Sequence, residues 1–212
     1  MRSHYIKTKA KSKDLLRLEL FSDAVFAIAI TLLVLELVQI LHNHSDGSLW
    51  DMLISNWKSF VAFLIGFLTI LVCWINHHLV FSYILNVDSK LFWINGFVLL
   101  VITFTPLPTA VLAEYIKKES HNALAFFGFN YFMVSLAAYS LSAHILKKVA
   151  RKTDRGLLYY HTRLYKYSIF YTLFAFLVCF LSVPLAIFFY LILFIVFAFP
   201  KEFLIMLKKQ KN

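Results

Sequence analysis

The chain has 212 residues, of which 61% are hydrophobic and only 15% are charged. Soluble domains contain about 45–50% apolar residues, so this composition excludes an ordinary soluble protein and indicates one integral membrane domain over residues 1–212. The net charge of +10 is compatible with a nucleic-acid partner or with a membrane topology signal, and the positions of the basic residues decide between them.

Six apolar segments alternate with polar connections along the chain. The first, Arg17 to Val38, is long enough to cross a bilayer at about 1.5 Å per residue. A polar loop from His42 to Asn56 and a short turn from Asn86 to Lys90 flank the second segment. The sequence therefore predicts an all-α membrane protein with six transmembrane helices, at about 17–40, 58–85, 91–116, 123–146, 168–183 and 184–200.

Proline and charge mark the less regular parts of this pattern. Pro106 and Pro108 predict a kink or an early end in the third helix, because proline cannot donate a backbone hydrogen bond. Pro184 suits the first turn of the sixth helix, so a hairpin is expected at Ser182–Pro184. Residues 147–167 are basic and rich in tyrosine, and we expect them to form a connector between the fourth and fifth helices.

The basic residues lie almost entirely on one side of the predicted membrane. Of the 21 lysines and arginines, all but Lys58, Lys117 and Lys118 fall in the two tails or in the connections on the same side. The positive-inside rule then places both termini in the cytoplasm. This distribution explains the net charge without a nucleic-acid partner, and none is expected.

The first helix contains ionisable residues that a purely lipid-facing segment would avoid. Arg17 and Glu19 stand near its start, Glu36 near its end, and Asp23 about two turns inside. Such a group costs about 2.5–3.5 kcal/mol at the bilayer centre and is usually paired or functional. The terminal three are equally compatible with interfacial positions, whereas Asp23 requires a partner or a function.

A helical projection separates Asp23 from an apolar stripe. At about 100° per residue, Thr31, Leu32 and Leu35 lie within about 60° of Ile28, and Asp23 lies about 140° away. Phe21 and Ala24 fall on the stripe as well. Periodicity alone favours ordinary helix packing for this stripe.

Two short motifs resemble a known family. Arg17, Phe21, Ser22 and Asp23 form an Arg-x-x-x-Phe-Ser-Asp motif, and the second helix contains Trp74-x-x-His77. Together they resemble the signature of the endosomal and lysosomal potassium channel family named for transmembrane protein 175. The motif occurs once here, as in single-repeat prokaryotic members, whereas eukaryotic members resemble two fused copies.

The resemblance implies a pore on the first helix. Ile28 would form the first apolar ring, Thr31 a hydroxyl layer, and Leu32 or Leu35 the next narrowing. An apolar constriction can gate by dewetting and favour the less strongly hydrated potassium ion over sodium. The chain contains no TVGYG-type carbonyl filter.

The resemblance further implies a leak-like potassium-preferring channel in a prokaryotic cytoplasmic membrane. It would assemble as a homotetramer within the lipid bilayer. It would need no cofactor beyond the permeant potassium ion and would not be an enzyme.

A structural network is expected on the side of the first helix that turns away from the pore. The second helix brings polar groups to the depth of Asp23, and a third-helix asparagine can tie two helices together. The expected members of this network are Arg17, Phe21, Ser22, Asp23, Trp74, His77 and Asn95.

Other functions remain possible at this point. Asp23 or His77 could titrate in a proton-coupled transporter or proton pathway, and a scaffold could use the same network for packing alone. His42, His44 and Asp46 resemble metal ligands but lack a fourth fixed partner. The serines at positions 135, 140 and 142 near His144 lack a nucleophile turn, so no hydrolase is expected.

Overall fold

The computed structural model describes residues 13–43, 48–150 and 155–199, which form helices and a single antiparallel bridge between Ile84 and Ala150. Four stretches are long and apolar enough to cross a bilayer: Lys13–Leu35, Trp57–Phe81, Ser89–Tyr115 and Ser120–Lys148. A shorter apolar helix covers Val183–Ala198. The expected all-α membrane fold is confirmed at this level.

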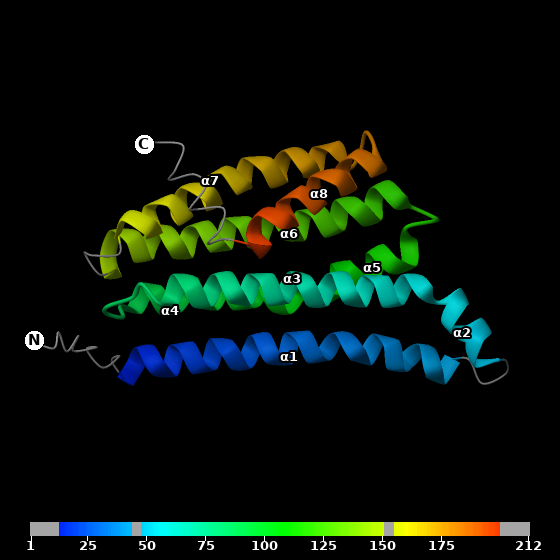
Figure 1. Ribbon diagram of the computed structural model, residues 1–212, viewed down its shortest axis with the longest axis horizontal. Coiled ribbons are helices and arrows are strands. Elements are labelled where there is room, and N and C mark those ends of the chain that lie inside the picture. Colours follow the sequence, from blue (N-terminus) through cyan, green and yellow to red (C-terminus); the bar gives the residue numbers. More distant parts are fainter. Residues whose placement is uncertain (1–12, 44–47, 151–154, 200–212) are drawn as a thin grey trace, which may run out of the picture.

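The helices run back and forth along one long axis (Figure 1). The first half of the chain contains α1 (Lys13–Asn43), the short α2 (Leu49–Ser55), α3 (Trp57–Phe81), α4 (Ser89–Phe104) and α5 (Pro106–Tyr115). The second half contains α6 (Ser120–His144), a π-helical turn η1 (Ile145–Val149), α7 (Arg155–Val178) and α8 (Val183–Ala198).

The bundle has two layers, with α1 at one edge and α7 at the other (Figure 1). In the first layer α1 packs against α3 and α4, and in the second α6 packs closely along α7. The main core joins the layers, because it contains Phe26, Ile70 and Ile102 of the first layer and Leu141 and Leu158 of the second. A smaller core of Leu124, Ala175 and their neighbours lies between α6, α7 and α8. The exposed edge helix α1 is therefore braced from one side only.

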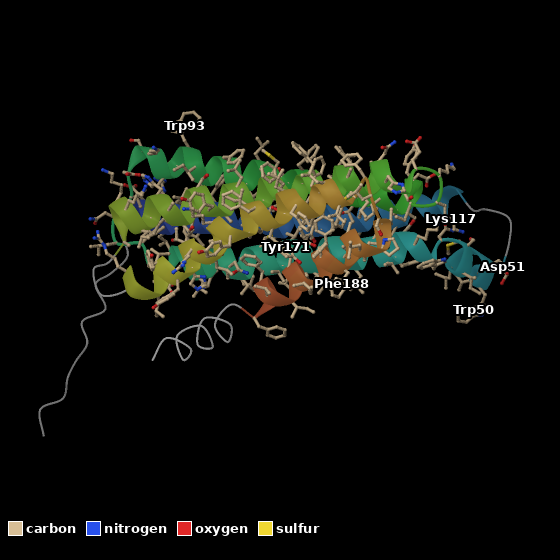
Figure 2. All side chains as sticks on the ribbon, turned by 90° about the horizontal axis from the view of Figure 1, so that it is seen from above. Trp50, Asp51, Trp93, Lys117, Tyr171 and Phe188 are labelled. Carbon is tan, nitrogen blue, oxygen red and sulfur yellow. The ribbon has the colours of Figure 1, made fainter. Side chains whose placement is uncertain are left out.

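Exposed tryptophans mark the two ends of the bundle. Trp93 lies at the end where α1 begins, and Trp50 lies at the opposite end (Figure 2). Trp93 is 83% exposed and Trp50 is 70% exposed. Tryptophan is enriched at both membrane–water interfaces, so these positions are consistent with a bundle whose long axis crosses the bilayer.

The expected break in the third segment is present, at Thr105. Pro106 begins α5, and the Thr105 hydroxyl donates to the carbonyl of Val101 at 3.2 Å. The Asn130 amide of α6 donates in turn to the Thr105 hydroxyl at 3.1 Å. A helix kinked by proline is tolerated in a membrane when side chains bind the freed backbone groups, and Thr105 does so here.

The prediction of a connector over residues 147–167 is wrong for its second half, because α7 already begins at Arg155. Its buried face carries Leu158, His161, Thr162 and Tyr165, which follow helical spacing. The basic side chains lie on the exposed face of the same helix, and this lowered the average hydropathy enough to suggest a loop. The fifth helix is consequently longer than the expected 168–183.

Several other boundaries also differ from expectation. The first helix is longer than 17–40, and the second ends at Phe81 instead of Leu85. The loop expected from His42 to Asn56 contains α2, whose first turn is capped by Ser48, since Ser48 Oγ accepts the Trp50 N–H at 3.3 Å. Local capping explains this short helix, which hydropathy does not detect.

The turn between α3 and α4 is fixed by Asp88. Its carboxylate accepts the Leu91 N–H at 2.8 Å, which caps α4, and it contacts His144 Nε2 at 2.9 and 3.0 Å. The hydrogen bond from His144 holds the pKa of the Asp88 carboxyl below its ordinary value, with Lys148 acting in the same direction. One side chain thus joins the start of α4 to the end of α6.

Replacing Asp88 with alanine is expected to destabilise the protein by about 1 kcal/mol, as for other lost helix caps. Because the carboxyl has a lowered pKa when folded, its contribution is present above its ordinary pKa and is lost as the pH falls below about 4. Thermal unfolding of detergent-solubilised protein should therefore separate wild type from Asp88→Ala at pH 7 and bring them together at low pH. Asp51→Ala is the matched control, since Asp51 lies exposed in the first turn of α2; a difference that persists at low pH would contradict this role for Asp88.

Candidate functional site

A continuous chain of buried hydrogen bonds ties three helices together. His77 of α3 donates through Nε2 to Asn95 Oδ1 of α4, and Asn95 Nδ2 donates to Ser22 Oγ of α1, each at 2.8 Å. Ser22 then donates to the carbonyl of Leu18 at 2.8 Å. Because an amide oxygen can only accept, the proton of His77 lies on Nε2. Ser22 and Asn95 are 0% and 1% exposed, so this chain lies wholly inside the bundle.

Asp23 makes a second link between α1 and α3. Its Oδ1 accepts the indole N–H of Trp74 at 2.8 Å. Carboxylates in membrane segments normally have such a partner, because an unpaired one is costly. Ser22 and Asp23 therefore anchor one stretch of α1 through two neighbouring side chains.

Aromatic contacts hold the same histidine in place. The His77 ring stacks on Phe81 with centroids 4.1 Å apart, and it meets Phe26 of α1 at 5.2 Å. His77 has both a fixed hydrogen bond and fixed ring neighbours, so its position is over-determined. This arrangement favours a positioning role over rapid reorientation.

Sequence reasoning left His78 unassigned, and the structure pairs it with α1. His78 Nδ1 lies 3.9 Å from Glu19 Oε1, and its ring lies 5.9 Å from that of Trp74. Glu19 is buried on α1, one turn before Asp23. The separation of one helical turn between Trp74 and His78 matches that between Asp23 and Glu19, which was the available signal for this pair.

Two expected members of the network lie elsewhere. Arg17 is exposed, and no contact with the network is found for it among the described residues. Phe21 is 61% exposed and points away from α3 and α4. Both positions fall near Ile28 in the helical projection, so their place on the opposite side from Ser22 follows from the helix period. Their membership of the network, which could involve a second subunit, stays a prediction.

The side of α1 opposite the network is open. The described residues leave its large apolar side chains exposed; Ile28 is 56% and Leu35 53% exposed, and Leu32 is similarly exposed. We refer to Phe21, Ala24, Ile28, Thr31, Leu32 and Leu35 as the open face of α1. α1 itself lies at the edge of the bundle (Figure 1), and the residues of the open face are its exposed ones.

Thr31 is the polar residue of the open face. Its hydroxyl donates to the carbonyl of Ile28 at 2.9 Å. The hydroxyl proton is thereby used within the helix, and the oxygen keeps its acceptor capacity on the exposed side. An oxygen of this kind can contact a cation, whereas the flanking isoleucine and leucines cannot.

Comparisons with known proteins agree with this geometry. Residues 17–106 match the family described as endosomal/lysosomal potassium channel TMEM175. A potassium channel of Chamaesiphon minutus is 39% identical over 176 residues, covering 81% of this chain and 87% of that protein. The chain belongs to the TMEM175 family.

Two further TMEM175 relatives extend the comparison. A potassium channel of Streptomyces collinus is 42% identical over 62% of this chain and 64% of its own length, which is slightly less than two thirds. The crystal structure of a lysosomal potassium-selective channel TMEM175 homologue from Chamaesiphon minutus superposes with a TM-score of 0.75 at 36% identity. That match covers 88% of this chain and 97% of the solved one.

The segment matched by the TMEM175 family model contains the whole network. It begins at Arg17 and ends at Pro106, the first residue of α5. Both faces of α1 and their partners on α3 and α4 therefore lie within the match. The rest of α5 and the helices of the second layer, α6 to α8, lie beyond it.

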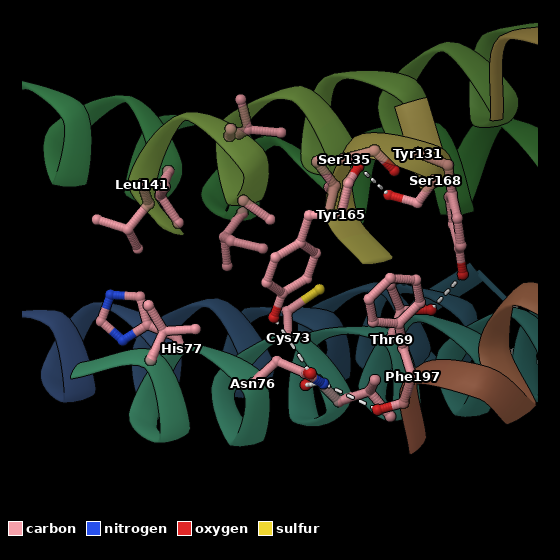
Figure 3. A pocket seen from close by; sticks show the side chains of 18 of the residues that line it. Thr69, Cys73, Asn76, His77, Tyr131, Ser135, Leu141, Tyr165, Ser168 and Phe197 are labelled. Atoms are coloured by element: carbon pink, nitrogen blue, oxygen red, sulfur yellow. Dashed lines mark hydrogen bonds between the residues drawn. The ribbon is translucent and has the colours of Figure 1, made fainter. Parts of the chain in front are cut away.

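A small cavity lies behind the network, between the two layers (Figure 3). It has a volume of about 90 Å³, and its lining includes His77, Cys73 and Leu141. Tyr165 of α7 donates to Asn76 Oδ1 at 3.2 Å, and Asn76 Nδ2 donates to the carbonyl of Phe197 at 2.8 Å. These bonds fix α7 and α8 to α3, and sequence reasoning missed them because the partners lie far apart in the chain.

The weaker candidates do not gain support from the structure. Among the residues that the structure describes, no group of three or more His, Cys, Asp or Glu side chains could hold a metal ion. His44 and Asp46 lie outside the described residues, as does the side chain of His42. Ser140 and Ser142 donate to carbonyls of their own helix, at 2.8 and 3.2 Å, which does not suit a nucleophile paired with a base.

Proposed function

We propose that this chain is the subunit of a potassium-preferring channel whose pore is lined by the open face of α1. The observation that carries the proposal is the division of α1 into two sides. One side is tied to α3 and α4 by the bonds of Ser22 and Asp23, and the other presents exposed Ile28, Leu32 and Leu35. A helix fixed in this way can present an apolar surface at a constant position.

The choice of potassium comes from the relatives. The two bacterial relatives are named potassium channels, and the solved homologue is described as potassium-selective. In this chain, rings of Ile28 and of Leu32 or Leu35 would form a narrow apolar passage, and Thr31 would supply oxygens between them. Such a passage requires an ion to shed water, which disfavours the more strongly hydrated sodium ion.

A pore on the edge of one bundle needs more than one copy, and four are proposed. Symmetric repetition would close the open faces around one axis, because cyclic symmetry is the common way to bury the same surface in every subunit. With potassium as the permeant ion, no other cofactor is required. The second layer, including α7, would then lie on the outside of the assembly, far from the axis.

The proposal also includes six helices that cross a prokaryotic cell membrane, with both termini on its cytoplasmic side. The paths of α1, α3, α4–α5, α6, α7 and α8 alternate in direction (Figure 1). Most of the described cations lie at the end where α1 begins or on the first half of α7, which starts from that end: Lys13, Arg17, Lys90, Lys147, Lys148, Arg155, Arg163 and Lys166. Only Lys58, Lys117 and Lys118 of the described lysines and arginines lie toward the other end, which supports this orientation under the positive-inside rule.

The alternative of a proton-coupled transporter would use Asp23 or His77 as a titrating carrier. Asp23 Oδ1 and His77 Nε2 each have a fixed partner, at 2.8 Å in both cases. A carrier that moved either group between two positions would have to break its bond to that partner in every cycle. The geometry therefore favours bracing.

Liposome flux tests the proposed function. Purified protein in potassium-loaded liposomes should release potassium down its gradient when a protonophore lets protons enter to balance the charge. The flux should continue when buffers hold the internal and external pH equal. When the gradient is reversed, external sodium should enter the liposomes more slowly than external potassium does. Flux that requires a proton gradient would favour the transporter, and no flux from a folded oligomer would favour a scaffold.

A further inference from the structure

A second and larger pocket lies between α3, α5, α6 and α8, away from the open face of α1. Its volume is about 390 Å³, within the range of about 300–1,000 Å³ that is typical of ligand sites. It extends from Trp57 and Lys58, where α3 begins, to Thr69, Tyr131 and Tyr190 near the middle of the bundle. From Lys58 to Thr69, α3 rises about 16 Å, so the pocket is long in the direction of the helices.

The hydroxyl groups that line this pocket already have partners. Thr69 and Tyr131 share a hydrogen bond of 2.6 Å, Thr109 donates to the carbonyl of Thr105 at 2.9 Å, and Tyr190 contacts Cys179 Sγ at 3.6 Å. A guest without polar groups can therefore occupy the deep part and leave no hydroxyl unsatisfied. Ala62, Ile65 and their neighbours supply an apolar wall.

One end of the pocket differs from the apolar deep part, because a charged side chain, Lys58, lines it. Lys58 is the charged side chain among the residues of the lining, and no ion pair is found for it among the described residues. Trp57 beside it is exposed, as is typical at a membrane interface. The site thus combines a hydrocarbon slot parallel to the helices with a single cation at the level of the lipid head groups.

We propose that this pocket binds one acyl chain of an anionic phospholipid, with Lys58 facing the phosphate. The slot follows the direction of lipid tails in the surrounding leaflet, so a lipid can enter without turning. The deep lining favours hydrocarbon over a polar ligand, and the charge of Lys58 favours an anionic head group over a zwitterionic one. This inference needs a membrane but does not depend on which ion the protein conducts.

The head-group preference is tested by native mass spectrometry of the full chain, released from micelles that contain phosphatidylglycerol or phosphatidylcholine with identical acyl chains. Wild type is expected to retain more phosphatidylglycerol. Lys58→Gln should reduce that excess roughly two- to fivefold, the range for a partly exposed ion pair. Lys117→Gln is the matched control, since Lys117 is exposed near the same end and is not part of the lining; an equal loss in both variants would overturn the assignment of Lys58.

The acyl-chain site is tested by filling the slot. Ala62→Phe should abolish retention of both lipids, and Ala113→Leu, a milder change in the same pocket, should weaken it if Ala62→Phe does not fold. Unchanged retention in a folded filled variant would overturn the proposal. If that variant also formed a smaller oligomer, the pocket would be assigned to a second copy of the chain and not to a lipid. Potassium flux is measured separately, so a failure of the channel assignment leaves the lipid readout intact.

Discussion

Asn95→Leu protein is expected to be less stable than wild type by about 2 kcal/mol, among the largest effects of any single polar residue in this bundle. An interhelical hydrogen bond in a membrane averages only about 0.6 kcal/mol. Here, however, the leucine would also leave the buried N–H of His77 without an acceptor, which costs about 1–3 kcal/mol. The unsatisfied group therefore outweighs the lost bonds.

The measurement is unfolding in mixed micelles, followed by circular dichroism as a denaturing detergent is added. Asn122→Leu is the matched control, because Asn122 is exposed and, among the described residues, donates to the nearby Glu119 side chain at 3.1 Å. Its free energy of unfolding should change little. A similar loss in both variants would mean that the effect comes from the residue type and not from the buried chain.

A double-mutant cycle separates the two contributions. Phenylalanine at position 77 can keep the ring stack on Phe81, which has a centroid distance of 4.1 Å, while removing the donor. Replacing both partners of a buried hydrogen bond by apolar groups is often nearly neutral. His77→Phe combined with Asn95→Leu should therefore be destabilised by less than the sum of the two single changes, and strict additivity would contradict direct coupling.

The sequence was most informative where a polar residue interrupts an apolar helix. Ser22, Asp23, Trp74, His77 and Asn95 could all be selected as members of a network, because polar groups inside a membrane segment need partners. The period of 3.6 residues also separated Asp23 from Ile28. Physical rules placed polar groups of the second helix at the depth of Asp23, and the family motif singled out Trp74 and His77 among them.

Side-chain contacts near the ends of helices, and the bounds of the helices themselves, were harder to predict. Arg17 was included in the network by motif, yet within one subunit it is exposed. The link from Asp88 to His144 joins positions 56 residues apart, for which one sequence gives no signal. The start of α7 was hidden because hydropathy averages over a basic exposed face and an apolar buried one.

Ile28→Asn is expected to change ion passage more than any other substitution on α1. If the open face lines the pore, four polar side chains would replace an apolar ring and hydrate the constriction. Flux should rise, by about tenfold for each 1.4 kcal/mol removed from the barrier. The preference for potassium over sodium should fall toward one, because neither ion would then need to shed as much water.

Liposome flux in matched potassium and sodium gradients measures both quantities. Leu173→Asn is the control, since Leu173 is, like Ile28, an exposed aliphatic residue but lies on α7, in the layer away from α1 (Figure 1). It should leave the ratio of the two fluxes unchanged. An unchanged ratio in folded Ile28→Asn protein would place selectivity elsewhere.

Asp23→Ala gives the complementary result and distinguishes lining from bracing. Removing the acceptor of the Trp74 N–H should loosen α1 and lower the fraction of assembled protein, seen by size-exclusion chromatography. The protein that does assemble should keep its preference for potassium, because Asp23 points away from the open face. If assembly were normal and the ratio changed, Asp23 would itself face the ions, and the two sides of α1 would have been assigned the wrong way round.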